Sequence, residues 1–161
     1  MKKVILTIGI PGCGKSTFVK KECKDYVQLE RDILRKHICQ GKEHFKNYNS
    51  ETDNFWDYYY SQDKISINKI EMMINRQYDE VIKQGHELLV ISDTNINKKN
   101  REHLAETLKS NGYEVEYKVF DVPLWWCLHN NQKRLDKVKE SIIHDMFYRL
   151  HKDFLNEQIK I

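Results

Sequence analysis

Short runs of apolar residues recur four times along the chain, and longer stretches of mixed polar and apolar residues separate them. Val, Ile and Leu dominate most of these runs, and polar or turn-forming residues follow them. A short apolar run bounded in this way is typical of a strand in a parallel sheet, where helices cover both faces. The pattern predicts strands over residues 4–8, 26–29, 88–91 and 115–120.

The clearest helix in the pattern covers residues 65–84, where apolar residues return every three or four positions. Gly85 follows directly and is the residue type that most often ends a helix. We expect the buried side of this helix to consist of Ile70, Met73, Ile74, Tyr78, Val81 and Ile82.

Further helices are predicted from weaker periodicity and from capping residues. Asn97 is expected to cap a helix that ends near Ser110, before Gly112, and Ser141 to cap the final one. The final helix repeats apolar residues at helical spacing: Ile143, Phe147, Leu150 and Phe154. Helices are also expected over 15–24, after the turn at 30–35, and over 124–135, whereas 40–62 is expected to be irregular or a short helix.

The order of these elements predicts an α/β fold. Strands alternate with helices, which favours a parallel sheet of about four strands with helices on both faces. The 161 residues are enough for one domain with its own core, so we expect a single domain over 1–161.

A glycine-rich turn follows the first predicted strand. Gly9, Gly14, Lys15 and Ser16 stand at the spacing G-x-x-x-x-G-K-[ST], which is the phosphate-binding loop of nucleoside-triphosphate enzymes. Glycines let backbone N–H groups turn inward towards phosphate oxygens, and the helix that follows aims its positive end at the same anion. The alternative is a strand-to-helix turn without a ligand. We expect the nucleotide to contact Gly12, Cys13, Gly14, Lys15, Ser16 and Thr17.

Aspartates stand at the ends of the other predicted strands, the edge where ligands bind in such sheets. Asp93 follows the third strand and has the position of a carboxylate that holds Mg²⁺, directly or through water, beside Ser16. Its alternative role is that of a turn or helix-capping aspartate. Asp32 and Asp121 follow the second and fourth strands.

Asp32 and Arg35 are three residues apart and share a face if their segment is helical. A carboxylate could then take the proton of an attacking hydroxyl while the arginine grips an anion. A surface ion pair is the alternative. Arg134 is expected on the helix after the fourth strand, where a lid arginine could neutralise phosphates or form part of a solvated basic face.

Composition and charge restrict the setting without fixing the function. The net charge of +3 permits a nucleic-acid partner but does not by itself indicate one. No apolar run approaches the roughly 20 residues that span a bilayer, so no membrane is expected. The cysteines are scattered, which suits free thiols and a cytoplasmic protein: Cys13, Cys23, Cys39 and Cys127.

Four segments together resemble the 5′-kinase domain of the T-even phage polynucleotide kinase/phosphatase family. They are MKKVILTIGIPGCGKST at 1–17, RDILR at 31–35, ISDTN at 91–95 and VEYKVFDVP at 115–123. They occur in the family's order and at similar separations, so the resemblance covers nearly the whole chain. It implies a kinase-type P-loop fold and phosphoryl transfer from ATP.

The resemblance also implies a role for each matching position. Lys15 and Ser16 match the phosphate and metal residues, and Asp93 and Thr94 match the D-T-N element of the site, in which Thr94 is expected to contact the substrate. The remaining matches are Asp32 as the general base, Arg35 as the clamp on the substrate phosphate 3′ to the attacking hydroxyl, and Arg134 as the lid arginine.

Two departures from the family pattern concern the lid, expected around 129–139 as a mobile segment. The family reads R-N-x-x-R there, whereas this chain has Asn130 in place of the first arginine. His129 or Lys133 could take its place. The Val-Pro that often follows the lid is replaced near Lys139, and no D-x-D-G-T phosphatase motif occurs, so no phosphatase domain is expected.

These observations predict a 5′-hydroxyl polynucleotide kinase for nucleic-acid repair, with Mg²⁺ as cofactor, an NTP as donor and an RNA or DNA end as acceptor. The alternatives are a kinase of a small alcohol such as a nucleoside or sugar, and a nucleotide-gated binding module without turnover. The sequence is compatible with either a monomer or a homo-oligomer.

Two local expectations concern side chains near this site. The aromatic cluster at 55–60 is expected to place at most one or two of its rings against a substrate, because aromatics are more often packing residues. Cys13 is expected to be the most reactive thiol, because backbone N–H donors and Lys15 favour a thiolate.

Overall fold

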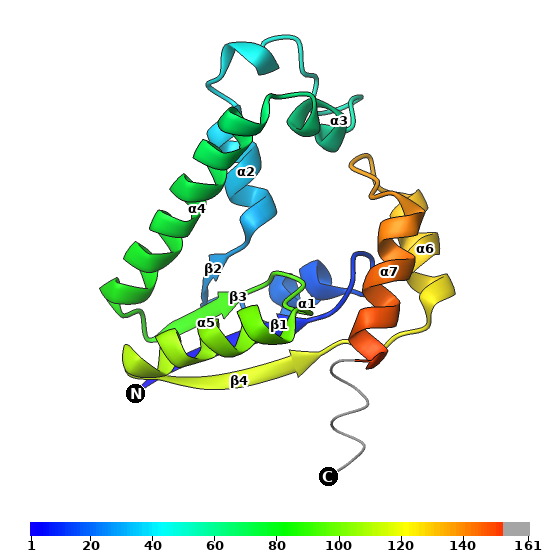
Figure 1. Ribbon diagram of the computed structural model, residues 1–161. Coiled ribbons are helices and arrows are strands. Elements are labelled where there is room, and N and C mark those ends of the chain that lie inside the picture. The colour runs from blue at the N-terminus through cyan, green and yellow to red at the C-terminus, as the bar shows by residue number, and fades with distance from the viewer. Residues whose placement is uncertain (153–161) are drawn as a thin grey trace.

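The computed structural model describes residues 1–152, apart from the side chain of His44, and contains a single sheet with helices on both faces (Figure 1). The strands are β1 (Lys2–Ile8), β2 (Val27–Leu29), β3 (Leu88–Ile91) and β4 (Tyr113–Val119). The helices are α1 (Lys15–Glu22), α2 (Arg31–Cys39), the short 3₁₀ helix η1 (Glu43–Phe45), α3 (Phe55–Tyr60), α4 (Lys64–Gln84), α5 (Lys98–Ser110), α6 (Leu124–Gln132) and α7 (Glu140–Leu150).

The strands pair in parallel in the order β2-β3-β1-β4. In the centre of the sheet, Ile5 is the register partner of Val90 on one side and of Glu116 on the other. This arrangement confirms the predicted α/β fold with a four-stranded parallel sheet. Because β1 lies between β3 and β4, the chain after β1 emerges where the strand order changes direction, which is the usual ligand site of such sheets.

Apolar residues on both faces of the central strands explain why the sheet is covered twice. Val4 and Leu6 face the main core, which α2, α4 and α5 complete. Ile5 and Val90 face the opposite side and pack against Val19 of α1. The continuous apolar runs of the sequence therefore have the meaning expected for a parallel sheet.

A third apolar cluster joins the loop after β1 to the last helices. Ile8, Ile10 and Cys13 pack there against Cys127 of α6 and Ile143 of α7. Packing of Ile10 and Cys13 in this cluster therefore stabilises the glycine-rich loop, in addition to the loop's own backbone contacts.

The long helix α4 has the predicted extent to within one residue. Asp63 accepts a hydrogen bond from the Ser66 backbone N–H at 2.8 Å and caps its start, and Gly85 ends it with a φ of 75°. Its buried side advances in steps of four residues, and Met73 lies at the edge of that stripe, 49% exposed. The expectation that Met73 is buried was wrong. The fully buried positions are Ile70, Ile74, Tyr78 and Ile82.

The last two helices differ from the predicted boundaries. α6 ends at Gln132, because the buried Asn131 side chain bonds both backbone groups of Val138, at 2.8 and 3.0 Å, and thereby turns the chain. Lys139, not Ser141, occupies the N-cap of α7, so the predicted cap was wrong. Phe154 lies outside the described residues. Ile143 and Leu150 are buried as predicted.

Residues 40–62 contain η1 and α3 joined by irregular segments, as predicted. Their aromatic rings form a cluster in which Phe45 stacks on Phe55 with centroids 6.0 Å apart. Among residues 1–152, no helix has both the length and the apolar character needed to cross a membrane.

Candidate functional site

The loop from Gly9 to Gly14 has the backbone conformation that a phosphate nest requires. Gly12 and Gly14 have φ values of 84° and 105°, a region that side-chain-bearing residues rarely enter. A Cβ on Gly12 would lie 2.5 Å from the backbone oxygen of Cys127, so α6 packs directly on the loop. Gly14 is the N-cap of α1, and it has no side chain to satisfy the first N–H groups of the helix.

Lys15 is folded back over this loop. Its Nζ donates hydrogen bonds to the backbone oxygens of Gly9 at 2.8 Å and Ile10 at 3.0 Å. The same nitrogen lies 3.6 Å from the sulfur of Cys13. The ammonium group is therefore held at the mouth of the nest, next to the N–H groups that a phosphate would contact.

Cys13 belongs to the apolar cluster with Ile8, Ile10 and Cys127. It is only 4% exposed, and the other three cysteines are buried as well. Burial of the thiol opposes the expected selective reactivity, whereas the Lys15 ammonium at 3.6 Å from the sulfur favours it, so that expectation stays a prediction. The backbone of Cys13 still belongs to the loop that lines the site.

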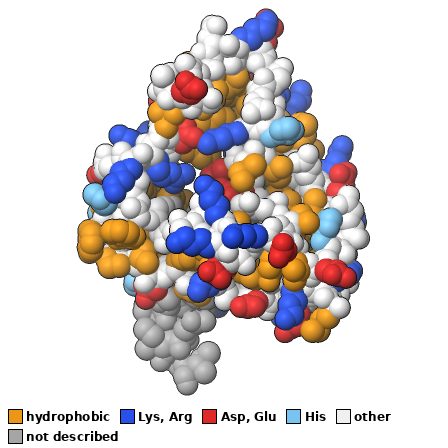
Figure 2. Space-filling model, turned by 180° about the vertical axis from the view of Figure 1, so that it is seen from behind, with side chains coloured by type: hydrophobic (Ala, Val, Ile, Leu, Met, Phe, Trp, Pro, Cys, Tyr) orange, Lys and Arg blue, Asp and Glu red, His pale blue; other side chains and the backbone are white. Residues whose placement is uncertain are grey.

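One large cavity of about 1690 Å³ brings the predicted residues together. Figure 2 shows a hollow on this side of the molecule with Lys and Arg side chains gathered around it. Asp121 is not among the described residues that line the cavity, and it lies 3.5 Å from Nε2 of His151. The lining includes every predicted site residue: Gly12, Cys13, Gly14, Lys15, Ser16, Thr17, Asp32, Arg35, Asp93, Thr94 and Arg134.

Asp93 is fixed by two donors at the end of β3. Its Oδ1 accepts a hydrogen bond from the Arg31 backbone N–H at 2.8 Å, and its Oδ2 accepts one from the Tyr78 hydroxyl at 2.6 Å. Burial raises the pKa of Asp93, although these two hydrogen bonds oppose the shift. The hydroxyl of Thr7 donates to the Asp93 backbone oxygen at 2.9 Å and holds the strand end in place.

The oxygen ligands beside the glycine-rich loop fit a magnesium ion that is held mainly by the phosphates of its nucleotide. Mg²⁺ in such sites takes one or two protein oxygens, with phosphates and water supplying the rest. Ser16 and Asp93 line the same cavity and offer a hydroxyl and a carboxylate. Within residues 1–152 there is no cluster of three or more His, Cys, Asp or Glu that could hold a metal without the nucleotide.

The neighbouring residues of the D-T-N element serve the backbone. Asn95 has a φ of 47°, and its side-chain amide donates to the Thr7 backbone oxygen at 2.9 Å. The backbone oxygen of Thr94 accepts a hydrogen bond from Gly9 at 3.0 Å. These contacts tie the end of β3 to the start of the glycine-rich loop, and Thr94 lines the cavity between them.

Asp32 and Arg35 lie on one face of α2, as predicted if the segment were helical. An Nη1–H of Arg35 donates to Oδ1 of Asp32 at 2.6 Å. Both residues line the cavity, and the Asp32 side chain is 41% exposed. The arrangement is an ion pair, but it faces the cavity that contains the glycine-rich loop and not the open surface.

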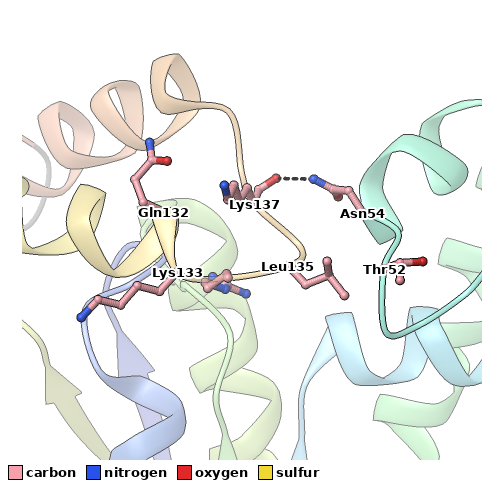
Figure 3. Close-up of a pocket in the computed structure, with 7 residues that line it drawn as sticks. Thr52, Asn54, Gln132, Lys133, Leu135 and Lys137 are labelled. Atoms are coloured by element: carbon pink, nitrogen blue, oxygen red, sulfur yellow. Dashed lines mark hydrogen bonds between the residues drawn. The ribbon is translucent and has the colours of Figure 1, made fainter.

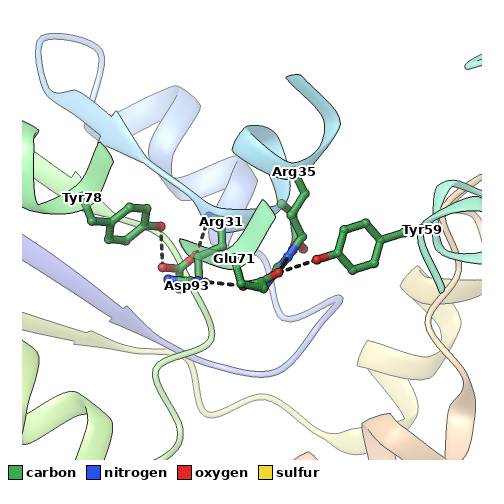
Figure 4. Close-up of polar contacts among 7 residues, drawn as sticks. Arg31, Arg35, Tyr59, Glu71, Tyr78 and Asp93 are labelled. Atoms are coloured by element: carbon green, nitrogen blue, oxygen red, sulfur yellow. Dashed lines mark hydrogen bonds and ion pairs between the residues drawn. The ribbon is translucent and has the colours of Figure 1, made fainter. Parts of the chain in front are cut away.

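Glu71 on α4 holds Arg35 from the other side, and the sequence did not single it out. Its two oxygens accept hydrogen bonds from Nε of Arg35 at 2.7 Å and from Nη2 at 3.1 Å. Arg31 donates to the same carboxylate at 2.7 Å, and the Tyr59 hydroxyl does so at 2.5 Å. Figure 4 shows these contacts as a row that runs from Tyr78 and Asp93 through Glu71 to Tyr59.

The charges of this row shift each other's proton affinities. Burial alone would raise the pKa of Glu71, but hydrogen bonds from Arg35, Tyr59 and Arg31 outweigh it and lower that pKa to about 2. Burial likewise opposes the charge of Arg35, and the hydrogen bonds to Glu71 raise its pKa instead. A sequence signal existed: two arginines flank Asp32, so a second carboxylate was needed to neutralise them.

Glu30 is a further acidic residue of the site that sequence reasoning missed. One of its carboxylate oxygens accepts hydrogen bonds from Ser92 at 3.0 Å and Gln28 at 3.1 Å. Burial raises the pKa of Glu30, and the nearby charges of Asp32 and Asp93 act in the same direction. Its position directly after β2 was the available signal.

Arg134 stands in the segment between α6 and α7, not on the helix where it was expected, because Asn131 ends α6 early. We call residues 133–139 the lid segment. Asp136 ties it to α2 and α3 by pairing with Lys36 and by accepting from the Phe55 backbone N–H at 2.8 Å. Figure 3 shows Asn54 donating to the Lys137 backbone oxygen, at 3.1 Å, beside a smaller cavity of about 510 Å³.

Asn130, which replaces the first lid arginine of the family pattern, has a structural partner. Its side-chain amide donates to the backbone oxygen of Gly12 at 2.8 Å. The departure therefore replaces a charge that could reach a phosphate with a short contact that fixes α6 to the loop.

Residues 4–152 match the AAA domain family, and the chain belongs to that family of P-loop proteins. Its relatives include a protein named for polynucleotide kinase and RNA ligase, and the solved structures of similar fold include a gluconokinase. A protein of Autographa californica nuclear polyhedrosis virus, whose assigned name is bifunctional polynucleotide kinase/RNA ligase, is 28% identical over 136 residues. The match covers 84% of this chain and 19% of that protein, so this chain spans about a fifth of the relative's length.

Solved structures share the fold at lower identity. A chain of the Pnkp1/Rnl/Hen1 RNA repair complex superimposes with a TM-score of 0.65 at 20% identity, over 94% of this chain and 44% of that one. A gluconokinase from Sinorhizobium meliloti 1021 gives a TM-score of 0.52 at 14% identity, over 92% and 74%. The predicted P-loop kinase fold and the resemblance to polynucleotide kinases are thereby confirmed.

Proposed function

We propose that the protein is a 5′-hydroxyl polynucleotide kinase, which transfers the γ-phosphate of ATP to the 5′-OH of RNA or DNA. The observation that carries this proposal is the Asp32–Arg35 pair facing the cavity of the glycine-rich loop. A kinase of an alcohol needs a carboxylate near the nucleophile, and a polynucleotide acceptor also brings a phosphate that needs a cation.

In the proposed reaction, Asp32 accepts the proton of the 5′-hydroxyl as its oxygen attacks the γ-phosphorus. The bond from that phosphorus to the β–γ bridging oxygen breaks, and ADP leaves. Oδ1 of Asp32 is engaged by Arg35 at 2.6 Å, which orients the carboxylate and leaves Oδ2 for the hydroxyl. Bound Mg²⁺, held by Ser16, Asp93 and the phosphates, would supply charge neutralisation.

The cations around the cavity have separate tasks in this proposal. Lys15 leaves its backbone partners for the β- and γ-phosphates, and Arg134 approaches them from the lid segment. Arg35 uses three of its five N–H groups on Asp32 and Glu71. Two remain for the phosphate that follows the attacking nucleotide.

A kinase of a small alcohol is the second candidate, and the likeness to a gluconokinase fold favours it. Such an acceptor has no phosphate for Arg35 to hold. Transfer of radiolabelled γ-phosphate to 5′-OH RNA, 5′-OH DNA, a nucleoside and gluconate, measured side by side, tests the two proposals. We expect transfer to the oligonucleotides. Transfer to a small alcohol alone overturns the polynucleotide proposal, and ATP binding without transfer to any acceptor indicates a binding module.

A further inference from the structure

The aromatic residues of α3 divide into two groups. Phe55 and Tyr59 are 1% and 2% exposed and belong to the main core, and Tyr58 packs on Tyr48 with ring centroids 5.1 Å apart. Trp56 and Tyr60 instead line the large cavity, and Tyr60 is 68% exposed. Trp56 also packs against the main core along one side, but it and Tyr60 are the two aromatic residues of α3 that line the cavity.

The two cavity-facing rings are arranged as a stack. Their centroids are 5.9 Å apart, and their planes are inclined by 28°. Trp56 also lies next to Arg35, whose guanidinium carbon is 6.0 Å from the centroid of the Trp56 ring. Contacts thus lead from Asp32 to Arg35 at 2.6 Å, then to Trp56, and finally to Tyr60.

Packing alone does not account well for Trp56. Its indole N–H is buried and has no hydrogen-bond partner among the described residues, which costs free energy that an apolar side chain would avoid. Tyr60 extends the same surface towards solvent, where an exposed ring gains little from packing.

The charges near the two rings favour a base over a phosphate as their occupant. Asp57 lies between them in the sequence and also lines the cavity, so its carboxylate repels a phosphate group there. Lys137 and Lys139 line the cavity from the lid segment, where the phosphates of an acceptor strand would find cations that ATP does not use. An aromatic surface is a sequence-tolerant support for an unpaired base.

We propose that Trp56 and Tyr60 form a stacking platform for the second nucleobase of the acceptor strand. This inference rests on the proposed function, in which the 5′-hydroxyl lies at Asp32 and the next phosphate at Arg35. The nucleotide after that phosphate then reaches Trp56 and Tyr60. The platform assigns the substrate class as an oligonucleotide end whose second base is unpaired, and not a mononucleotide.

The test combines an altered protein with an altered acceptor. Oligonucleotides with a 5′-hydroxyl carry an abasic site at the first, second or third nucleotide, and KM is measured for each. Stacking on a protein ring is worth about 1–3 kcal/mol per base, so the abasic second nucleotide is expected to raise KM roughly 5- to 100-fold with the wild type. Tyr60→Ala is expected to raise KM for the intact acceptor and to remove most of this discrimination. Tyr60→Phe is expected to retain it.

Tyr148→Ala is the matched control, because Tyr148 is also exposed, at 64%, and is not among the residues that line the cavity. It should leave every KM unchanged. Thermal unfolding of Tyr60→Ala should resemble that of the wild type, since the ring is exposed.

Each outcome bears on the platform. Equal effects of Tyr60→Ala on intact acceptors and on acceptors abasic at the second nucleotide overturn it, as does discrimination at the first or third nucleotide in place of the second. Wild-type transfer with equal KM for intact and abasic acceptors removes the platform and leaves the proposed function in place. No transfer to any oligonucleotide removes both.

Discussion

The two sides of the cavity are built in different ways. The side proposed to bind the phosphate donor, which we call the donor wall, is formed by the glycine-rich loop, α1 and α6. It is shaped by backbone atoms and by the apolar cluster of Ile10, Cys13 and Cys127. The side proposed to bind the acceptor, which we call the acceptor wall, is formed by α2 and α3 and is held by side-chain charges that centre on Glu71 of α4. A wall of backbone resists single substitutions, whereas a wall of paired charges depends on each member.

The largest expected effect follows from removing the proposed base of the acceptor wall. Asp32→Asn keeps the shape of the side chain and removes its ability to accept a proton. Loss of a general base typically costs about 100- to 10,000-fold in rate, while ATP affinity should persist because the donor wall is untouched. Single-turnover transfer and nucleotide binding measure the two quantities. Asp79→Asn, which changes an exposed carboxylate on α4 outside the cavity lining, is the control and should transfer at the wild-type rate. Near wild-type transfer by Asp32→Asn would exclude Asp32 from the mechanism.

Glu71→Gln tests whether Arg31 and Arg35 of the acceptor wall depend on Glu71, a residue that does not line the cavity. It removes the charge that orients Arg31 and Arg35. Hydrogen bonds to charged groups are worth about 2 kcal/mol, so the free energy of unfolding should fall by about that amount. Misplacement of Arg35 should raise KM for oligonucleotides about 10- to 100-fold and leave KM for ATP near its wild-type value.

Glu80→Gln is the matched control, because Glu80 is an exposed glutamate on the same helix. It should change neither KM for oligonucleotides nor KM for ATP. A similar rise of KM for ATP in Glu71→Gln would show that the two walls are not independent.

Most of the donor wall could be predicted from the sequence, whereas the contact of Glu71 with the acceptor wall could not. The glycine-rich loop is contiguous, so the spacing of Gly9, Gly14 and Lys15 states its geometry directly. Glu71 lies 36 positions beyond Arg35, and nothing local marks one glutamate of an amphipathic helix as a partner of α2. Tertiary packing decided that contact.

The lid shows the same limit. The helix predicted over 124–135 ends earlier, because the hydrogen bonds between Asn131 and Val138 turn the chain and leave Arg134 in the lid segment. Asn130 departs from the family pattern, and only the fold shows its contact with Gly12.

The pH dependence of the free energy of unfolding should reveal the contribution of ionised Glu71 beside the acceptor wall. The pKa of Glu71 is lowered from 4.5 to about 2 in the folded protein, so its ionised form favours folding. This contribution is fully present above pH of about 4.5 and is lost as the pH falls towards 2. The difference in unfolding free energy between wild type and Glu71→Gln should therefore be largest near neutral pH and shrink by pH 3. Denaturant titrations at both pH values measure it, and a constant difference would contradict the ionised role of Glu71.

The smallest effect is expected on the donor wall. Asn130→Ala removes the hydrogen bond to Gly12 and should cost about 1 kcal/mol, seen as a rise of KM for ATP of roughly five-fold. KM for oligonucleotides should stay near the wild-type value. Gln132→Ala, an exposed neighbour on α6, should change neither constant, and a larger effect of Asn130→Ala on the oligonucleotide would assign Asn130 to the acceptor wall.

The role of Arg35 as a phosphate clamp is the central claim, and acceptors that differ by one phosphate test it most directly. Transfer of labelled γ-phosphate to the 5′-OH of a nucleoside 3′-monophosphate is compared with transfer to the plain nucleoside, for the wild type and for Arg35→Ala. We predict that the wild type prefers the 3′-monophosphate strongly and that Arg35→Ala narrows the preference by lowering use of the 3′-monophosphate. Equal use of both acceptors by the wild type would contradict the polynucleotide kinase proposal and favour a kinase of small alcohols.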